Sequence, residues 1–273
     1  KEEFAFADGF FSGYDPDKSK YDKSTWEYQT GADRFHTFSS VAEGKMIFDF
    51  LPSWEGLEVL EIGCGEGRLA SMIGTCGAAH VDAIDYSQEA IATANRRFKL
   101  GNVTFRCADA HSVKRRYDVV VLAGVLEHLD DPFGELKSII RRNLKRDGIL
   151  IASTPSFLNP RGYVWMTLQL LFNVPMSLTD LHFLCPFDFQ EFAAKNKLGI
   201  EIRSTNQDWG AGPRLIVDFK KRLCNALIDK GMDKSGVRRL LFWLEKAVKY
   251  FRTDEFSGQT VAYKLRRLGR GYN

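Results

Sequence analysis

The feature that most constrains this chain is an apolar segment that runs directly into alternating glycines, over residues 59–67. The segment reads VLEIGCGEG, and a helix is predicted to begin after it, at Arg68. Glycine accepts the positive φ of a tight turn, and it lets a ligand approach the backbone where a Cβ would block it. The first turn of the helix adds unpaired amide donors. The segment therefore predicts a strand, a ligand-binding loop and a helix in direct succession.

The same alternation of strands and helices continues to about residue 155. Strands are predicted at 58–62, 80–85, 103–107, 117–122 and 149–153, and helices at 68–73, 88–100 and 132–144. This alternation is typical of an α/β fold with a doubly wound, mostly parallel sheet. Ligands of such sheets bind at the carboxyl ends of the strands, near the point where the strand order reverses. Functional residues should therefore follow directly after the strands.

Local signals set the expected ends of the helices. The Ser87 hydroxyl can accept from first-turn amides, so Ser87 is predicted to cap the helix 88–100, and Gly101 is predicted to stop it. Asp147 and Gly148 are predicted to form the turn that follows the helix 132–144. Another helix is predicted at 41–51.

Beyond residue 155 the pattern becomes irregular. Residues 156–186 and 205–256 are interpreted as insertions, and the second contains two amphipathic helices broken near 231–236. A helix predicted at 187–197 and strands predicted at 199–203 and 260–265 complete a seven-stranded sheet. The apolar stretch 163–175 is shorter than the ~20 residues of a membrane-spanning helix. It is interpreted as a core helix or as part of a lid over a substrate, and both readings stay open.

Charge and cysteine content narrow the function classes. Residues 214–273 hold 15 lysines and arginines against six acidic residues, which suits an anionic substrate, a membrane surface, nucleic acid or a solvated helix face. The five cysteines are odd in number and form no CxxC pair, so neither a disulfide framework nor a zinc site is expected. An acidic, aromatic amino terminus differs from a signal peptide, and a cytoplasmic location is expected.

The strand ends, taken together, resemble the class I methyltransferases that use S-adenosyl-L-methionine (AdoMet). The spacing E-x-G-x-G-x-G over residues 61–67 differs from the G-x-G-x-x-G of dinucleotide enzymes, because the third glycine comes one residue early. Asp85 closes the second predicted strand, where a carboxylate can bind both ribose hydroxyls, and Asp109 follows the third. Residues 123–132, AGVLEHLDDP, resemble the segment after the fourth strand in the branch that includes ubiquinone-biosynthesis and many small-molecule methyltransferases.

This resemblance covers residues 41–155 well and 180–203 weakly, and it implies AdoMet as the cofactor. We expect a methyltransferase domain over 41–273. Residues 1–40, which the resemblance does not cover, are expected to form an aromatic-rich cap, whose Tyr14, Tyr21, Trp26 and Tyr28 either cap the cofactor or simply pack. Within the family, Glu61 would meet the amino group of the cofactor and Asp109 its adenine. The residues expected to bind the cofactor are Glu61, Gly63, Cys64, Gly65, Gly67, Asp85, Tyr86, Ser87, Asp109, Ala110, Ala123 and Gly124.

Methyl transfer requires that the acceptor and the methyl group be held in line with water excluded, and a hydroxyl or ammonium acceptor must also lose a proton. His128 and His182 are the candidate catalytic residues. Each has a structural alternative, since His128 can support its own loop and His182 can pack among Leu181, Phe183 and Leu184.

Missing motifs exclude several acceptors. Residues 123–126 lack the Asn/Asp-Pro-Pro-aromatic segment of enzymes that methylate adenine or glutamine nitrogen, and they lack the Pro-Cys of cytosine C5 enzymes. No residue spacing suggests a metal site.

The sequence therefore predicts methyl transfer to an O or N atom of a small molecule such as a sugar, a quinone or a secondary metabolite. The alternatives are a methyltransferase for RNA or another macromolecule, a non-catalytic binding subunit, and a NAD-dependent oxidoreductase. The expected partner is a small-molecule acceptor. Nucleic acid is not expected, nor is a transmembrane segment, and peripheral contact with a membrane stays open.

Overall fold

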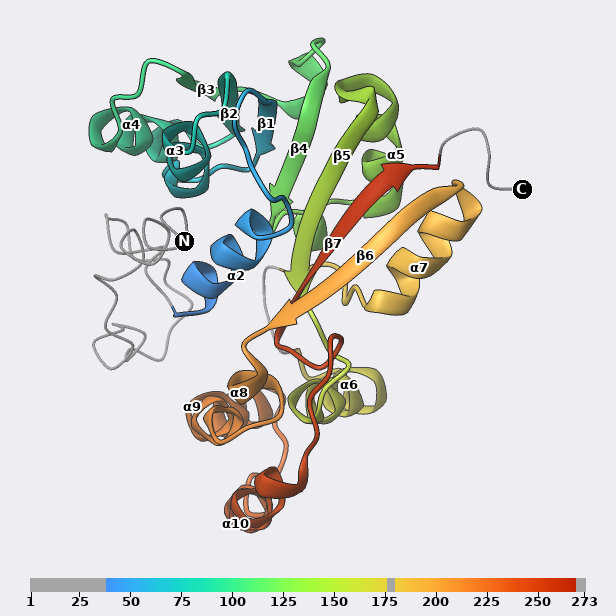
Figure 1. Ribbon diagram of the computed structural model, residues 1–273. Helices are drawn as coiled ribbons and strands as arrows, with labels where there is room; N and C mark the ends of the chain where they lie inside the picture. The colour runs from blue at the N-terminus through green and yellow to red at the C-terminus, as the bar shows by residue number, and fades with distance from the viewer. Residues whose placement is uncertain (1–37, 176–179, 269–273) are drawn as a thin grey trace.

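The computed structural model describes residues 38–175 and 180–268, and its core is a seven-stranded sheet (Figure 1). The aromatic cap predicted over residues 1–40 lies almost entirely outside the described residues, as do the four aromatic residues named in it. The strands are Glu58–Ile62 (β1), His80–Asp85 (β2), Val103–Cys107 (β3), Tyr117–Ala123 (β4), Leu144–Pro155 (β5), Leu198–Thr205 (β6) and Thr260–Arg267 (β7). This confirms the predicted seven-stranded, doubly wound sheet.

The strand order is β3-β2-β1-β4-β5-β7-β6. All pairs are parallel except those of β7, which runs antiparallel to both β5 and β6. The chain proceeds from β1 outward to β3 and then returns to place β4 on the other side of β1. The order therefore reverses between β1 and β4, and the loops that follow these two strands diverge there, as the sequence predicts for a binding site.

Helices cover both faces of the sheet. One face packs against α2 (Phe38–Phe48), α3 (Arg68–Thr75) and α4 (Gln88–Arg97), and the other against α5 (Pro132–Asn143) and α7 (Pro186–Lys195). Successive side chains of a strand point to opposite faces, so Val119 and Val121 enter the first core while Val120 and Leu122 enter the second. The unbroken apolar run of β4 is therefore needed because both of its faces are buried.

A third apolar cluster belongs to a separate helical module, defined here as α6 (Pro160–Phe172), α8 (Gln207–Gly210), α9 (Arg214–Asp229), α10 (Val237–Ala247) and the short helix η4 (Val248–Tyr250). These helices come from the two segments predicted as insertions. Figure 1 shows the module beyond the carboxyl end of β5, away from the amino ends of the parallel strands. Trp165 of α6 packs edge-on against Phe219 of α9, with ring centroids 5.7 Å apart.

Several predicted boundaries are wrong, among them those of the helix predicted at 41–51, which is α2 at Phe38–Phe48. Asp147 and Gly148 lie inside β5, because the register with β4 jumps from Tyr117 opposite Leu144 to Val119 opposite Ile149, which makes the intervening residues a bulge. Arg267 of β7 holds that bulge by donating from its guanidinium to the Lys145 carbonyl oxygen, 2.5 Å away. A turn signal in the sequence cannot distinguish a loop from a bulge that a neighbouring strand holds.

Helix α4 ends at Arg97, three residues before the predicted end at Leu100. Just beyond the helix, the side-chain amide of Asn102 donates to the carbonyl oxygens of Gly74 and Ala78, each at 2.8 Å, and this draws the chain away from the helix axis. These contacts tie the segment after α4 to the end of α3. The predicted cap at the other end is confirmed, since the Ser87 hydroxyl accepts from the Ala90 amide.

Candidate functional site

The glycine loop connects β1 to α3 at the carboxyl edge of the sheet. Gly63 and Gly67 have φ of 74° and 81°, in the left-handed region that glycine adopts without strain. Both positions are also crowded, because an added Cβ would lie 2.4 Å from a Val125 methyl at Gly63 and 2.4 Å from the Phe105 ring at Gly67. The alternate glycines therefore follow from backbone conformation and from the close approach of β3 and of the loop after β4.

Glu61 lies in β1, two residues before the first glycine, and only 2% of its surface is exposed. Its oxygen Oε2 has no hydrogen-bond partner among the described residues. Burial, opposed in part by the Ala70 amide, raises the pKa of this carboxyl to about 8. A buried acceptor without a donor costs free energy, which a cationic or N–H ligand group at this place would recover. The site thus fits the amino end of an AdoMet molecule.

Asp85 ends β2 beside the glycine loop, and its carboxylate braces that loop. Oδ2 accepts from the Gly65 amide and Oδ1 from the Ser87 amide, each at 2.8 Å. A carboxylate has about four acceptor positions, so it can still bind ribose hydroxyls. Asp85 therefore has a structural role at the start of the Ser87 helix and in the glycine loop, and any substitution there will also disturb the loop.

The residues expected at the adenine end are more open to solvent. Asp109 is exposed, and its carboxylate accepts from the amide of His111 at 2.6 Å, which is the main reason that its pKa is lowered. Ala110 begins the short helix η2 (Ala110–Ser112) that Asp109 caps, and Tyr86 is 90% exposed. In this structure Asp109 is occupied with its own helix, and its role toward a cofactor remains a prediction.

Three further expected residues line the reversal point. Cys64 is buried behind the loop, and burial raises the pKa of its thiol, so it is a packing residue without thiolate character. Ala123 ends β4, and Gly124 follows with φ of 62° and donates its amide to the Ser153 carbonyl oxygen at 3.1 Å. The predicted cofactor residues of β1, β2 and β4 thus meet at one edge of the sheet.

Both candidate histidines connect two loops. His128 ends the short helix η3 (Leu126–His128), and its Nδ1 lies 3.7 Å from an Asp180 carboxylate oxygen. His182 lies beside it, with Nε2 3.2 Å from the Asp130 carbonyl oxygen. The amides of Leu181 and His182 also contact the Glu127 carbonyl oxygen, at 2.8 and 3.3 Å. These contacts support the structural reading of both histidines, and their catalytic role stays a prediction.

The sequence did not single out two carboxyl groups that lie near the same edge. Burial, together with the charges of Glu43 and Asp180, raises the pKa of Glu127 to about 8. Glu43 comes from α2, where burial raises its pKa and its Oε1 accepts from the Ser153 hydroxyl at 2.6 Å. Glu127 lies within the segment that carries the family resemblance, so the sequence offered a signal for it. No sequence signal indicates that Glu43 is buried. Together they place proton-accepting groups near the end of β4.

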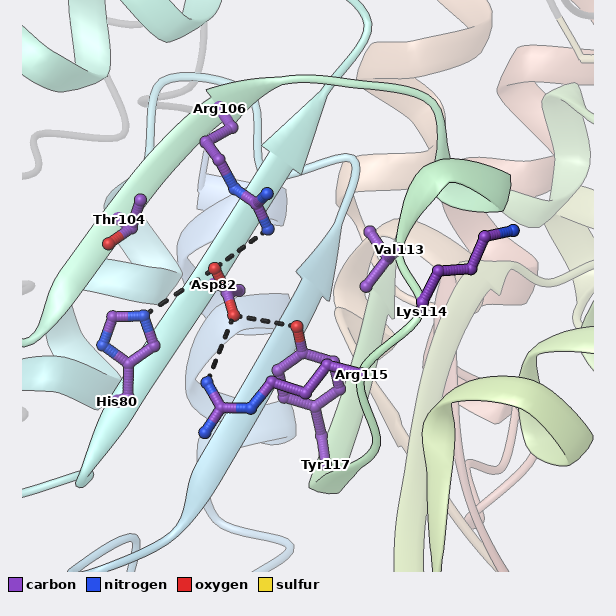
Figure 2. A pocket seen from close by; sticks show the side chains of 8 residues that line it. All are labelled: His80, Asp82, Thr104, Arg106, Val113, Lys114, Arg115 and Tyr117. Carbon is purple, nitrogen blue, oxygen red and sulfur yellow. Dashed lines mark hydrogen bonds and ion pairs between the residues drawn. The ribbon is translucent and has the colours of Figure 1, made fainter.

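A hollow of about 430 Å³ beside β2 and β3 is separate from the site at the glycine loop (Figure 2). Only the short helix η2 connects β3 to β4, so within the described residues this connection supplies no long helix to cover Asp82 of β2. Asp82 instead accepts from the Tyr117 hydroxyl at 2.8 Å and from Arg106 at 3.0 Å, with Arg115 at 3.8 Å. Its own neighbours therefore neutralise Asp82, and this hollow lies away from the carboxyl edge of the sheet.

No group of three or more histidine, cysteine or acidic side chains in the described part of the chain is arranged to hold a metal ion. The described helices include none that is long and apolar enough to cross a membrane.

Comparison with known proteins gives this site its family. Residues 59–148 match a family model described as a methyltransferase domain. Residues 59–148 are a methyltransferase domain. This span contains β1 to β4 and the glycine loop, and it ends within the bulge of β5.

Relatives with assigned functions share this methyltransferase domain. The malonyl-(acyl-carrier protein) O-methyltransferase of Bacillus anthracis is 35% identical over 104 residues, which are 36% of this chain and 37% of that protein. The ubiquinone biosynthesis O-methyltransferase of Neisseria meningitidis serogroup A is 29% identical over 165 residues, or 55% of this chain and 66% of that protein. The matched parts span less than two thirds of these relatives' own lengths.

The fold extends beyond the methyltransferase domain. An S-adenosylmethionine-dependent methyltransferase from Mesorhizobium loti superposes with a TM-score of 0.52 at 15% identity, covering 82% of this chain and 96% of that one. At this identity the similarity shows the fold alone. It shows that the strands beyond residue 148 belong to the same fold as the strands of the matched domain.

Proposed function

We propose that this protein transfers a methyl group from AdoMet to an O or N atom of a small molecule. The observation that carries the proposal is the Glu61 carboxyl, which is buried beside the glycine loop with one oxygen unpartnered among the described residues. A structural carboxyl in a strand would be expected to find a donor. An acceptor oxygen without a donor, at the edge of a methyltransferase domain, suits the cationic amino group of AdoMet.

In this proposal the residues that hold AdoMet are those at the carboxyl ends of β1 to β4. Glu61 accepts from the amino group of AdoMet, the backbone of the glycine loop lies against the cofactor, and Asp85 accepts from the ribose hydroxyls. Asp109 and Ala110 bind the adenine end, while Ala123 and Gly124 border the methyl group. AdoMet supplies an electrophilic methyl group when bound, so the chain's own work is to orient the acceptor and exclude water.

The acceptor side is assigned to the carboxyl groups of Glu43 and Glu127, together with His128 and His182. A base with a pKa near the working pH is effective at taking a proton from a hydroxyl or ammonium group. The pKa of about 8 makes Glu127 such a group. Two curated relatives are O-methyltransferases by name, which favours an oxygen acceptor. The helical module would form the remaining wall of the pocket.

A cytoplasmic location is part of the proposal. Its support is the five cysteines, none of which forms a disulfide in the described part of the chain, as is usual in a reducing compartment.

Calorimetric titration of the purified chain with AdoMet, S-adenosylhomocysteine and NAD tests the cofactor assignment. We expect micromolar binding of the first two and none of NAD. Glu61→Gln should weaken AdoMet binding at least tenfold, because glutamine cannot ionise beside the cationic amino group of the cofactor and is a weaker acceptor there. Glu191→Gln, on the exposed side of α7, is the matched control and should bind as the parent does.

An absence of AdoMet binding would favour a non-catalytic subunit, and binding of NAD alone would favour an oxidoreductase. Retention of full affinity in Glu61→Gln would refute the role given to Glu61.

A further inference from the structure

The outward face of α10 and η4 carries large aromatic side chains in solvent. Phe242 is 61% exposed, Trp243 60% and Tyr250 75%. Aromatic residues of this size are usually buried in a soluble domain, since each loses favourable burial when it faces water. Three of them on one short stretch of chain form an apolar patch, which is the sign of an interaction surface.

The helix has two distinct faces. Val237 and Leu244 point inward and are buried in the core of the helical module. Arg239, Phe242 and Lys246 follow the spacing i, i+3, i+7, which places them together on the opposite side. The outward face is therefore a continuous strip in which aromatic and cationic side chains alternate.

Positive charge dominates this strip. Residues 234–252 contain six lysines and arginines and one carboxylate, Glu245, which pairs with Lys220 of α9 at 2.8 Å. The Lys246 Nζ lies 4.0 Å from the centre of the Phe242 ring, and the Lys249 Nζ lies 5.0 Å from that of Tyr250. Cations and aromatic rings thus lie side by side and can meet a negative, partly apolar surface together.

We propose that the outward face of α10 and η4 docks this protein on a lipid bilayer that contains anionic headgroups. A helix with Trp and Phe on its exposed face and Lys and Arg among them suits the interface, where the rings enter the acyl boundary and the cations meet phosphate. The patch is charge-complementary to such a surface. Docking does not depend on methyl transfer, so the proposal stands apart from the proposed function.

The position of the helix in the molecule agrees with this role. Figure 1 shows α10 at the extremity of the helical module, with α9 and α6 between it and the sheet. A planar surface can therefore reach this face without meeting the sheet. A convex helix also offers no groove to follow a nucleic acid backbone, which single-strand binding proteins provide.

Sedimentation of the full chain with sucrose-loaded vesicles tests the proposal, using phosphatidylcholine alone and a 7:3 mixture with phosphatidylglycerol. We expect binding to the mixture, little binding to phosphatidylcholine alone, and loss of binding in 0.5 M NaCl because salt screens the charges. Lys246→Gln/Lys249→Gln should weaken binding about 25-fold, at about fivefold for each cation removed. Arg96→Gln/Lys99→Gln, at the exposed end of α4, is the matched control and should bind like the parent.

A second measurement tests insertion by the aromatic residues. Bilayers with brominated acyl chains should quench tryptophan emission of the parent, and Trp243→Phe should remove most of that quenching while circular dichroism stays unchanged. Failure of the parent to bind the anionic vesicles would overturn the proposal and leave an acidic protein or single-stranded RNA as the partner of this face. Equal binding by the α10 and α4 variants, or undiminished quenching in Trp243→Phe, would also overturn it.

Discussion

At the scale of single residues, burial raises the pKa of two carboxyl groups near the carboxyl edge of the sheet. The pKa of Glu61 and that of Glu127 are both raised to about 8, and burial is the larger cause in each. The identity of these residues is plain in the sequence. Their pKa values are not, because they depend on which other segments exclude water.

We predict a pH-dependent effect of Glu127→Gln on stability. The pKa of Glu127 is about 8 in the folded protein, against 4.5 for a glutamate in water, so the folded state holds the proton more tightly than the unfolded chain does. The stability that Glu127 contributes is complete below pH 4.5 and is lost as pH rises through 8. Glu127→Gln should therefore gain stability relative to the parent between pH 5 and pH 9, by at most about 4 kcal/mol.

Urea unfolding at both pH values measures this change. Glu55→Gln, an exposed residue, serves as the control and should show no such gain. A difference between Glu127→Gln and the parent that is the same at both pH values would contradict the raised pKa.

At the scale of secondary-structure elements, the sequence located the strands well and some connections poorly. The predicted limits of the strands β1 to β3 are those of the structure. Apolar runs bounded by glycine and polar residues are local signals, so the strands that they predict do not depend on contacts with distant segments. The bulge in β5 and the early end of α4 were missed, because each depends on Arg267 or Asn102 reaching a carbonyl oxygen from another element.

The loop between β1 and α3 gives a prediction at this scale. Gly67→Ala should destabilise the protein by about 1–4 kcal/mol, because the new Cβ would meet the Phe105 ring and the residue would keep a positive φ. Gly231→Ala is a matched control, since its φ is 65° and an added Cβ would meet nothing within 4 Å. It should cost only about 1–2 kcal/mol for the backbone conformation.

Thermal unfolding of both variants measures the difference. An equal loss of stability in the two would show that the contact with Phe105 relaxes at no cost.

At the scale of the whole molecule, a buried ion pair joins the two predicted insertions into one helical module. The Arg161 Nε of α6 donates to the Asp218 carboxylate of α9 at 2.8 Å, and both side chains are almost fully buried. Trp165 and Arg222 donate to the same carboxylate at 3.3 and 3.1 Å. Burial acts to raise the pKa of Asp218, but the charges of Arg161 and Arg222 outweigh it and lower the pKa, so the carboxylate stays charged.

We predict that Asp218→Asn destabilises the protein by about 3–5 kcal/mol, because two guanidinium groups would lose their shared counter-charge inside the module. Limited proteolysis should then cleave residues of the module before those of the sheet, since the pair lies in the separate third core. Asp229→Asn, at the exposed end of α9, is the control and should leave both stability and cleavage unchanged. Unfolding of module and sheet together in Asp218→Asn would show that the two cores are one cooperative unit.

The sequence by itself determined the α/β class, the strands, the glycine loop and the edge at which the site lies. These follow from local patterns, because glycine conformation and apolar alternation act within a few residues of the chain. Tertiary structure alone decided the raised pKa of Glu61 and Glu127, the contact of Asp85 with the Gly65 amide and the exposure of the aromatic side chains on α10. Each depends on contacts between distant segments, such as Glu43 with Ser153, 110 residues further along the chain. Burial and electric field are properties of the packed molecule, and no local pattern specifies them.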